Sequence, residues 1–207
     1  MTPTSAADEA PPTRPLGLRE QKKRRARDAM HVAALELVAE HGLTCVTAEM
    51  IAERADVSPR TFFNYWGTKD AAVLGLLPED GRALPQMLRD RPREEDPRVS
   101  LRAIVRHLGE SVPSEPAVRE LRKSVVDREP KLQQTSKGQM MELQAELIEV
   151  LQERLPGEDA FERATLYVQL AFAAARSAFA VSMRRGTAPP VEFERIYALI
   201  DSGKVGP

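Results

Sequence analysis

Three side chains in the N-terminal third of the chain have the chemistry needed to contact base edges in DNA. An α-helix turns by about 100° per residue, so a helix over residues 59–66 places Arg60, Phe63 and Asn64 on the face opposite Phe62. Asparagine can form two hydrogen bonds to adenine, arginine can reach guanine or a phosphate, and an apolar ring can contact the thymine methyl group. The set predicts a helix that enters the major groove.

Further polar groups flank this face and suit the phosphate backbone, whose contacts fix register without reading sequence. They are Thr47, Thr61, Tyr65 and Lys69. Aromatic side chains at helical spacing also occur in cores, so for Phe63 and Tyr65 packing inside the fold is the alternative. The combination of residues, and not any one of them, favours DNA contact.

Two short helices are predicted to position these groups. The first is expected over residues 47–55 and the second over residues 59–66, with Asp56, Val57 and Ser58 between them. Ser58 followed by proline is a strong start signal, because the hydroxyl caps free N–H groups and proline is tolerated at the first helical position. Two short helices joined by a tight turn describe a helix-turn-helix. Pro59, Phe62 and Trp66 share the other face, which we expect to be core.

One helix is predicted before this pair and one after it. Residues 18–41 carry a single apolar stripe at positions 30, 33, 34, 37 and 38, and Gly42 can take the left-handed conformation that ends a helix. Thr68 is expected to cap a fourth helix over residues 69–77.

Charge is distributed unevenly along the chain. The 207 residues carry 30 Lys and Arg against 31 Asp and Glu, so overall charge does not favour a polyanion. Residues 19–27 nevertheless hold six basic residues and one acid. Such a run is commonly a solvated face, but a base-reading element follows it here, which favours phosphate binding. The candidate phosphate contacts in the run are Lys22, Lys23 and Arg25.

The segment from Gly42 to Lys69 resembles the DNA-binding signature of tetracycline-repressor-type (TetR) transcriptional regulators. The shared features are glycine after the first helix, Thr at the start of the second, Ile-Ala inside it, Val-Ser at the turn, Thr-aromatic-aromatic-x-Tyr-aromatic in the third helix, and then Thr-Lys. Trp66, where the family usually has phenylalanine, and Gly67 depart mildly from the pattern. The resemblance covers about 50 residues. It implies an all-helical homodimer that binds operator DNA through its first four helices and has a ligand-responsive dimerisation domain behind them.

The resemblance also assigns roles position by position. It implies backbone contacts for Thr47, Thr61, Phe63, Tyr65 and Lys69, and positions that often face bases for Arg60, Asn64 and Glu49. Glu49 departs from the family pattern because phosphate repels an acid. Its carboxylate either accepts from a cytosine amino group or stays in solvent.

The rest of the chain repeats apolar residues at helical spacing, and no β-type alternation competes, so the fold class is all-α. We expect a disordered tail over residues 1–17, a DNA-binding domain over 18–77, a proline-rich connector over 78–97, a ligand-binding and dimerisation domain over 98–203, and a tail over 204–207.

The helix expected over residues 159–185 is apolar nearly all round, and small residues at 164, 171, 175 and 178 would let another helix approach closely. The alternatives are a homodimer interface and an intramolecular core. The resemblance further implies a pocket for a small-molecule effector, with these candidate ligand-binding residues: Ile104, Val105, Leu108, Leu121, Val125, Met140, Phe172 and Arg176. A charge within an apolar helix needs a partner, so Arg176 faces either a carboxylate across the interface or an acidic effector.

Other function classes find little support. The histidines do not sit at metal-ligand spacing, no glycine-rich phosphate loop is present, and Cys45 has no obvious base beside it, so we expect no enzyme, cofactor or metal site. The lone cysteine and the lack of a secretory signal or a good membrane span indicate a cytoplasmic protein. A helical module that binds a protein partner is the alternative to a DNA-binding regulator.

Overall fold

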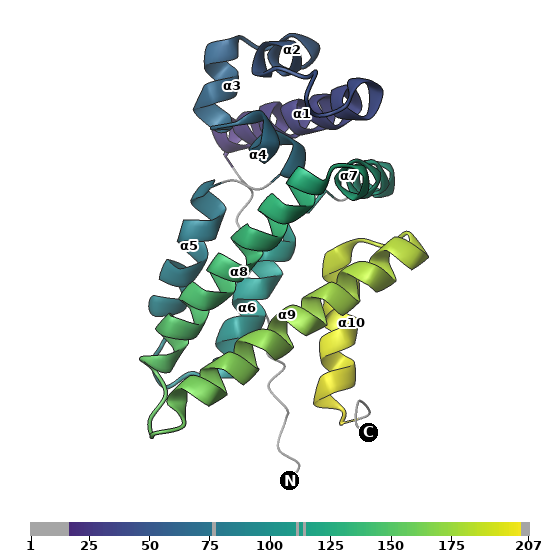
Figure 1. The fold of residues 1–207 in the computed structure, drawn as a ribbon. Coiled ribbons are helices and arrows are strands. Elements are labelled where there is room, and N and C mark those ends of the chain that lie inside the picture. Colours follow the sequence, from purple (N-terminus) through teal and green to yellow (C-terminus); the bar gives the residue numbers. More distant parts are fainter. Residues whose placement is uncertain (1–16, 76–77, 111, 114, 204–207) are drawn as a thin grey trace.

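The computed structural model describes residues 17–75, 78–110, 112–113 and 115–203. Within these residues the chain forms ten α-helices and no strand, which confirms the all-α prediction (Figure 1). Of the expected tails over residues 1–17 and 204–207, residues 1–16 and 204–207 lie outside the described residues. The helices are α1 (Leu18–His41), α2 (Ala48–Arg54), α3 (Pro59–Tyr65), α4 (Lys69–Leu74), α5 (Pro78–Arg89), α6 (Pro97–Glu110), α7 (Pro116–Arg128), α8 (Pro130–Gln152), α9 (Ala160–Arg185) and α10 (Pro189–Asp201).

The first four helices surround one apolar cluster. The predicted stripe of α1 is buried at all five positions, and Ile51 and Ala52 of α2 pack against it. Phe62 and Trp66 are 0% and 1% exposed, so the inward face of the second short helix is confirmed at these two residues. Pro59 is exposed, contrary to the prediction. It occupies the first position of α3, where the chain enters the helix from the surface.

The predicted start and stop signals hold the short helices in place. The Thr47, Ser58 and Thr68 side chains accept hydrogen bonds from the N–H groups of Met50, Thr61 and Ala71, at 3.3, 3.1 and 3.1 Å. Each bond satisfies an N–H that has no partner inside its own helix. Gly42 ends α1 at φ 78°, and Gly75 ends α4 at φ 66°. The helix α4 thus stops at Leu74, and the predicted end at residue 77 lies outside the described residues.

The expected connector over residues 78–97 is wrong, because α5 occupies most of it. Leu84 and Leu88 recur at helical spacing and are 1% and 0% exposed. The helix packs against α6 and α8. Burial of this apolar stripe outweighs the helix-breaking tendency of Pro85, which lies inside the helix.

A second apolar cluster joins α5, α6, α8, α9 and α10. The helix α9 crosses this bundle and packs against α6, α8 and α10 (Figure 1). Among the described residues it is the one helix whose length and hydropathy would also suit a membrane span, but core helices share those properties. Here α9 buries Ala164, Val168 and Phe172 against its neighbours.

The helix α7 belongs to the core of the N-terminal helices. Val125 of α7 and Leu132 of α8 are 3% and 0% exposed within that first cluster, and Leu121 packs against it. Figure 1 shows α7 beside α1, away from the lower part of the bundle. Two apolar residues that were expected to line an effector pocket, Leu121 and Val125, therefore stabilise the junction between the two parts of the molecule.

Candidate nucleic-acid interface and internal cavity

The surface of α3 carries the predicted base-reading residues. Arg60 and Asn64 are exposed, and Phe63 is 53% exposed. The Phe63 ring stands edge-on to the buried Phe62 ring, with centroids 5.4 Å apart and planes at 88°. This geometry supports an exposed aromatic ring on a rigid base. Phe63 is therefore not packed inside the core, which was the alternative interpretation of this residue.

The two flanking residues of α3 are less exposed. Thr61 and Tyr65 are each partly buried. The Thr61 hydroxyl lies 2.8 Å from the Ser58 hydroxyl, at the start of the helix. Tyr65 packs against the first apolar cluster, so the core alternative holds for part of its ring.

Thr47 and Glu49 lie together at the start of α2. Both are exposed. Hydrogen bonds from the Glu49 backbone N–H and from the Thr47 hydroxyl lower the pKa of the Glu49 carboxyl group. The carboxylate is thus held at the N-terminal end of α2, where the helix dipole favours an anion. The exposed carboxylate is compatible with both alternatives for Glu49, acceptance from a cytosine amino group and a position in solvent.

Lys69 has a structural role that the sequence did not predict. Its ammonium group donates to the backbone oxygens of Leu43 and Val46, at 2.7 and 2.6 Å. It thereby fixes the loop between α1 and α2 to the start of α4. An ammonium group has three donors, so one remains for the phosphate contact expected of Lys69.

The basic segment of α1 is open to solvent. Lys22, Lys23 and Arg25 are exposed, and no ion pair of the described residues involves them. Their neighbours Arg24 and Arg27 lie 3.9 and 3.8 Å from the Asp28 carboxylate. The three predicted phosphate contacts therefore retain uncompensated positive charge.

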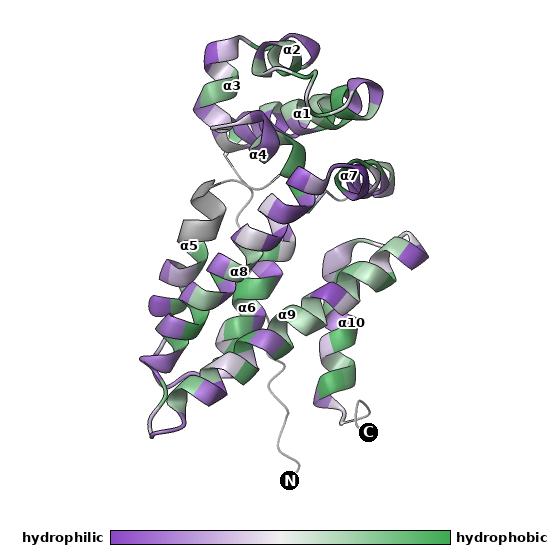
Figure 2. Cartoon of the chain, viewed as in Figure 1, coloured by the Kyte–Doolittle hydropathy of each residue, from purple (hydrophilic) through white to green (hydrophobic). Residues whose placement is uncertain are grey.

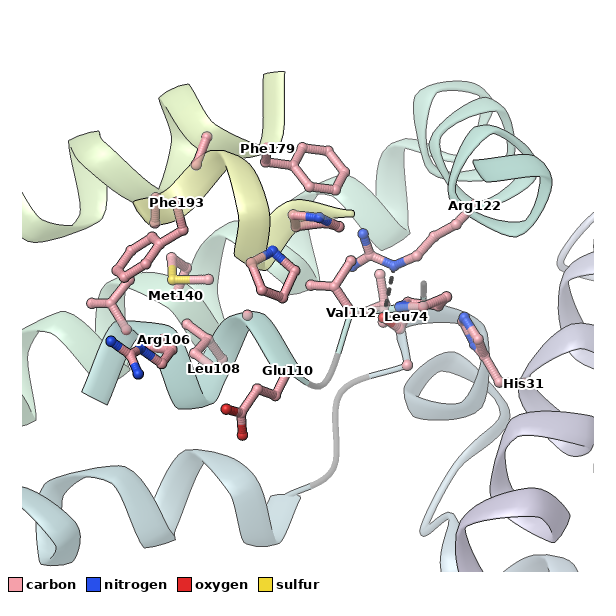
Figure 3. A pocket seen from close by; sticks show the side chains of 18 of the residues that line it. His31, Leu74, Arg106, Leu108, Glu110, Val112, Arg122, Met140, Phe179 and Phe193 are labelled. Atoms are coloured by element: carbon pink, nitrogen blue, oxygen red, sulfur yellow. Dashed lines mark hydrogen bonds between the residues drawn. The ribbon is translucent and has the colours of Figure 1, made fainter. Parts of the chain in front are cut away.

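A cavity of about 890 Å³ lies between the N-terminal helices and the bundle of α6, α8 and α9 (Figure 3). Five of the eight predicted ligand-binding residues line it: Val105, Leu108, Met140, Phe172 and Arg176. The prediction is wrong for Ile104, which is buried in the second apolar cluster, and for Leu121 and Val125, which pack in the first. These three face the neighbouring helices and not the cavity.

Several lining residues were missed by sequence reasoning, among them His31, Arg122, Phe179 and Phe193. His31 Nδ1 lies 2.7 Å from the Ala72 carbonyl oxygen, and burial lowers the pKa of His31 to about 4. The ring is therefore neutral near pH 7, with Nδ1–H donating to that carbonyl. Arg122 Nε–H donates to the Leu74 carbonyl oxygen at 2.9 Å. No local sequence pattern marks these positions, because the four residues lie on four different helices, α1, α7, α9 and α10, that come together only in the fold.

Two further contacts join the C-terminal part of the chain to the N-terminal helices. The Leu43 N–H donates to Glu129 Oε1 at 2.9 Å, and the Lys131 ammonium lies 2.8 Å from the Asp70 carboxylate. Glu129 and Lys131 stand at the corner between α7 and α8. This corner therefore holds both the loop after α1 and the helix α4.

An apolar surface remains uncovered on α9 and α10. Leu166 and Leu170 of α9 are 61% and 65% exposed, and Val191, Leu199 and Ile200 of α10 are 45–54% exposed. Apolar residues recur along both helices in Figure 2. The small residues Ala164, Ala171 and Ala178 are instead buried within the chain. Intramolecular packing thus accounts for one side of α9 and leaves the other side open.

The described residues contain no group of three His, Cys, Asp or Glu side chains that could hold a metal ion. The geometry defines a class of protein: a helix-turn-helix domain joined to a helical bundle with an internal cavity. The family model for "Bacterial regulatory proteins, tetR family" matches residues 32–74, from α1 to the end of α4. Residues 32–74, which contain the helix-turn-helix, are thus similar to the DNA-binding region of that family.

The HTH-type transcriptional regulator TcmR of Streptomyces glaucescens is 38% identical over 97 residues, which are 45% of this chain and 43% of TcmR. The chain thus aligns with less than half of that relative. A candidate fatty acid metabolism regulator of Clostridium perfringens has a similar fold, with a TM-score of 0.52 at 17% identity over 86% of this chain and 100% of the other. Thermus thermophilus FadR, a TetR family transcriptional repressor in complex with lauroyl-CoA, aligns at 23% identity over 87% of this chain and 96% of its own, with a TM-score of 0.42.

Proposed function

We propose that this protein is a cytoplasmic transcriptional regulator, not an enzyme, that represses its target genes by binding operator DNA. One observation carries the proposal: Arg60, Phe63 and Asn64 face outward from a helix whose opposite side is anchored by buried Phe62 and Trp66. A rigid helix with these groups suits the major groove. The exposed basic residues of α1 supply phosphate contacts beside it.

The operator is bound by a homodimer in this proposal. Leu166 and Leu170 of α9 and three apolar residues of α10 are exposed on two helices that pack against each other, and we propose that a second copy covers them. A two-fold dimer that binds DNA through both copies of α3 needs them about one DNA turn apart, roughly 34 Å, and predicts a pseudo-palindromic operator.

The cavity is the proposed effector site. It touches α1 and α4 on one side and the bundle on the other, so a bound molecule contacts both parts of the protein. An effector shifts the equilibrium only if it binds the DNA-free arrangement more tightly than the DNA-bound one. We propose that a small molecule does so and releases the operator.

The test begins with selection of bound fragments from genomic DNA by the full-length protein, followed by affinity measurement on the selected site. We expect binding at least roughly 10³-fold tighter than to random DNA, and a loss on the order of 10³-fold between 50 and 200 mM salt. The triple variant Arg60→Ala, Phe63→Ala, Asn64→Ala should lose the preference for the selected site. The control Arg89→Ala removes an exposed charge at the end of α5 and should bind as the parent does.

A protein that shows no preference among DNA fragments, or whose triple variant keeps that preference, would contradict the proposal. Binding that is insensitive to salt would indicate instead a helical module for a protein partner.

A further inference from the structure

The cavity is apolar along most of its wall. Val105, Leu108, Met140, Phe172, Phe179 and Phe193 line it from α6, α8, α9 and α10 (Figure 3). An apolar wall of this kind favours an apolar molecule, and a few polar groups then fix its orientation. The polar groups of the wall therefore decide which class of molecule is bound.

The charged residues of the lining fall into two groups. The acids are all exposed and lie in contact with water: Asp28, Glu110, Glu115, Glu142 and Glu146. Three arginines are also exposed: Arg24, Arg106 and Arg176. Two charged residues of the lining, Arg27 and Arg122, are partly buried. The Arg27 guanidinium lies 3.8 Å from the Asp28 carboxylate, which is its counter-ion.

Arg122 is the partly buried cation without a counter-ion among the described side chains. Its Nε–H donates to the Leu74 carbonyl oxygen, and no carboxylate of the described residues forms an ion pair with its guanidinium. Burial lowers the pKa of Arg122, and no neighbouring charge contributes to that shift. Figure 3 shows the guanidinium pointing from α7 toward Leu74 and Val112 at the edge of the cavity. A buried cation with unused donors is costly unless an anion accepts from it.

We propose that the effector is an apolar molecule carrying an oxyanion, such as a carboxylate or sulfonate, and that Arg122 binds this oxyanion. The inference rests on the effector site of the proposed function and adds the chemical class of its ligand. Arg176, the residue expected from the sequence to meet an acidic effector, is exposed, so an ion pair there is weakened by water. The guanidinium of Arg122 is better shielded and presents several N–H donors in a fixed plane.

Two fluorescent dyes with the same apolar body test the proposal on the full-length protein. The first, 1-anilinonaphthalene-8-sulfonate, carries an oxyanion, and the second, N-phenyl-1-naphthylamine, is neutral. We expect the sulfonate to saturate one site per chain and to bind about 10-fold or more tightly than the neutral dye. Arg122→Gln should remove that difference, and Arg122→Lys, which keeps the charge, should retain most of it.

One control variant and one comparison variant accompany these measurements. Arg128→Gln removes an exposed arginine of the same helix that does not line the cavity, and it should leave both affinities unchanged. Arg176→Gln removes an exposed arginine of the cavity lining and should lower the sulfonate affinity less than Arg122→Gln does. Thermal unfolding of each variant shows whether the Arg122 substitutions preserve the fold. Equal affinity of the two dyes for the parent protein would overturn the proposal. So would a loss of sulfonate affinity that appears in Arg176→Gln and not in Arg122→Gln.

The dye measurements contain no DNA, so their outcome is separate from that of the operator experiment. Specific DNA binding with no preference for the sulfonate rejects only the ligand class. A strong sulfonate preference in a protein that selects no DNA site rejects only the proposed function.

Discussion

Individual residues divide the N-terminal helices into a fixed part and a presenting part. Phe62 and Trp66 are buried and anchor α3. Phe63 projects from the same helix toward solvent, and its ring packs edge-on against the Phe62 ring. Lys69 and the three capping hydroxyls use their polar groups on the backbone. The side chains whose donors and acceptors form no hydrogen bond inside the chain therefore remain available to a partner. Arg60 and Asn64 are the chief examples.

His31 makes the stability of the protein depend on pH. Its pKa is lowered to about 4 from an ordinary value of 6.5, chiefly by burial. On acidification, the His31 side chain of the unfolded chain takes up a proton at a higher pH than that of the folded chain does. The contribution of the neutral, buried His31 to the stability of the fold is therefore complete above pH 6.5 and is lost progressively as the pH falls toward 4. We expect the free energy of unfolding to fall by up to about 3 kcal/mol across this window.

Urea unfolding of the parent protein and of His31→Gln at pH 7 and pH 5 measures this effect. The variant should be less stable than the parent at pH 7, because it loses the contact with the Ala72 carbonyl, and it should change less between the two pH values. An equal pH dependence in both proteins would show that other groups control the acid sensitivity.

The helices differ in how far local sequence determined them. The boundaries of α2 and α3 follow from Thr47 and Ser58, whose capping bonds involve residues three positions away, so the sequence pattern contains the information. The helix α5 was missed because Pro85 and the neighbouring charges mark a loop by local rules, whereas burial of Leu84 and Leu88 decides the structure. Arg122 was missed for a related reason: its environment depends on where α7 crosses α4.

The helical periodicity of α6 and α7 predicted which residues are apolar and buried, but not which core they join. Ile104 and Val125 have the same pattern as Val105 and Leu108, and only the packing of whole helices separates core from cavity lining. Five of the expected ligand residues line the cavity because three of the helices expected to line it, those carrying Val105, Met140 and Phe172, do so.

The corner between α7 and α8 gives a prediction at the scale of elements. Glu129→Ala removes the acceptor of the Leu43 N–H and leaves that donor without its partner, which should cost about 1–3 kcal/mol of stability. Denaturant unfolding measures the change. The control Glu149→Ala removes an exposed carboxylate from α8, the helix that Glu129 precedes, and should fall within about 0.5 kcal/mol of the parent. Equal stability of the two variants would mean that the corner contributes nothing to holding the loop.

At the scale of the whole molecule, the uncovered face of α9 and α10 determines the expected assembly. The double substitution Leu166→Glu, Leu170→Glu places two charges on this face and should convert the dimer to a monomer, because burying them without partners is unfavourable. Light scattering measures the mass, and affinity for the selected operator should fall with it. Met141→Glu alters a residue on α8 that is 72% exposed and should leave the mass unchanged. A parent protein that is already monomeric would refute the dimer.

The presence of Val125 and Leu132 in the first apolar cluster has a consequence for attempts to transplant the N-terminal helices, the proposed operator-binding part, onto other scaffolds. A fragment cut after Gly75 would be missing two of its own core side chains and the carboxylate that accepts from Leu43. Its hydrophobic interior would open toward water on the side where α7 had been. A transferable head must therefore carry α7 and the first turn of α8 with it, although some forty residues of unrelated sequence separate them from α4.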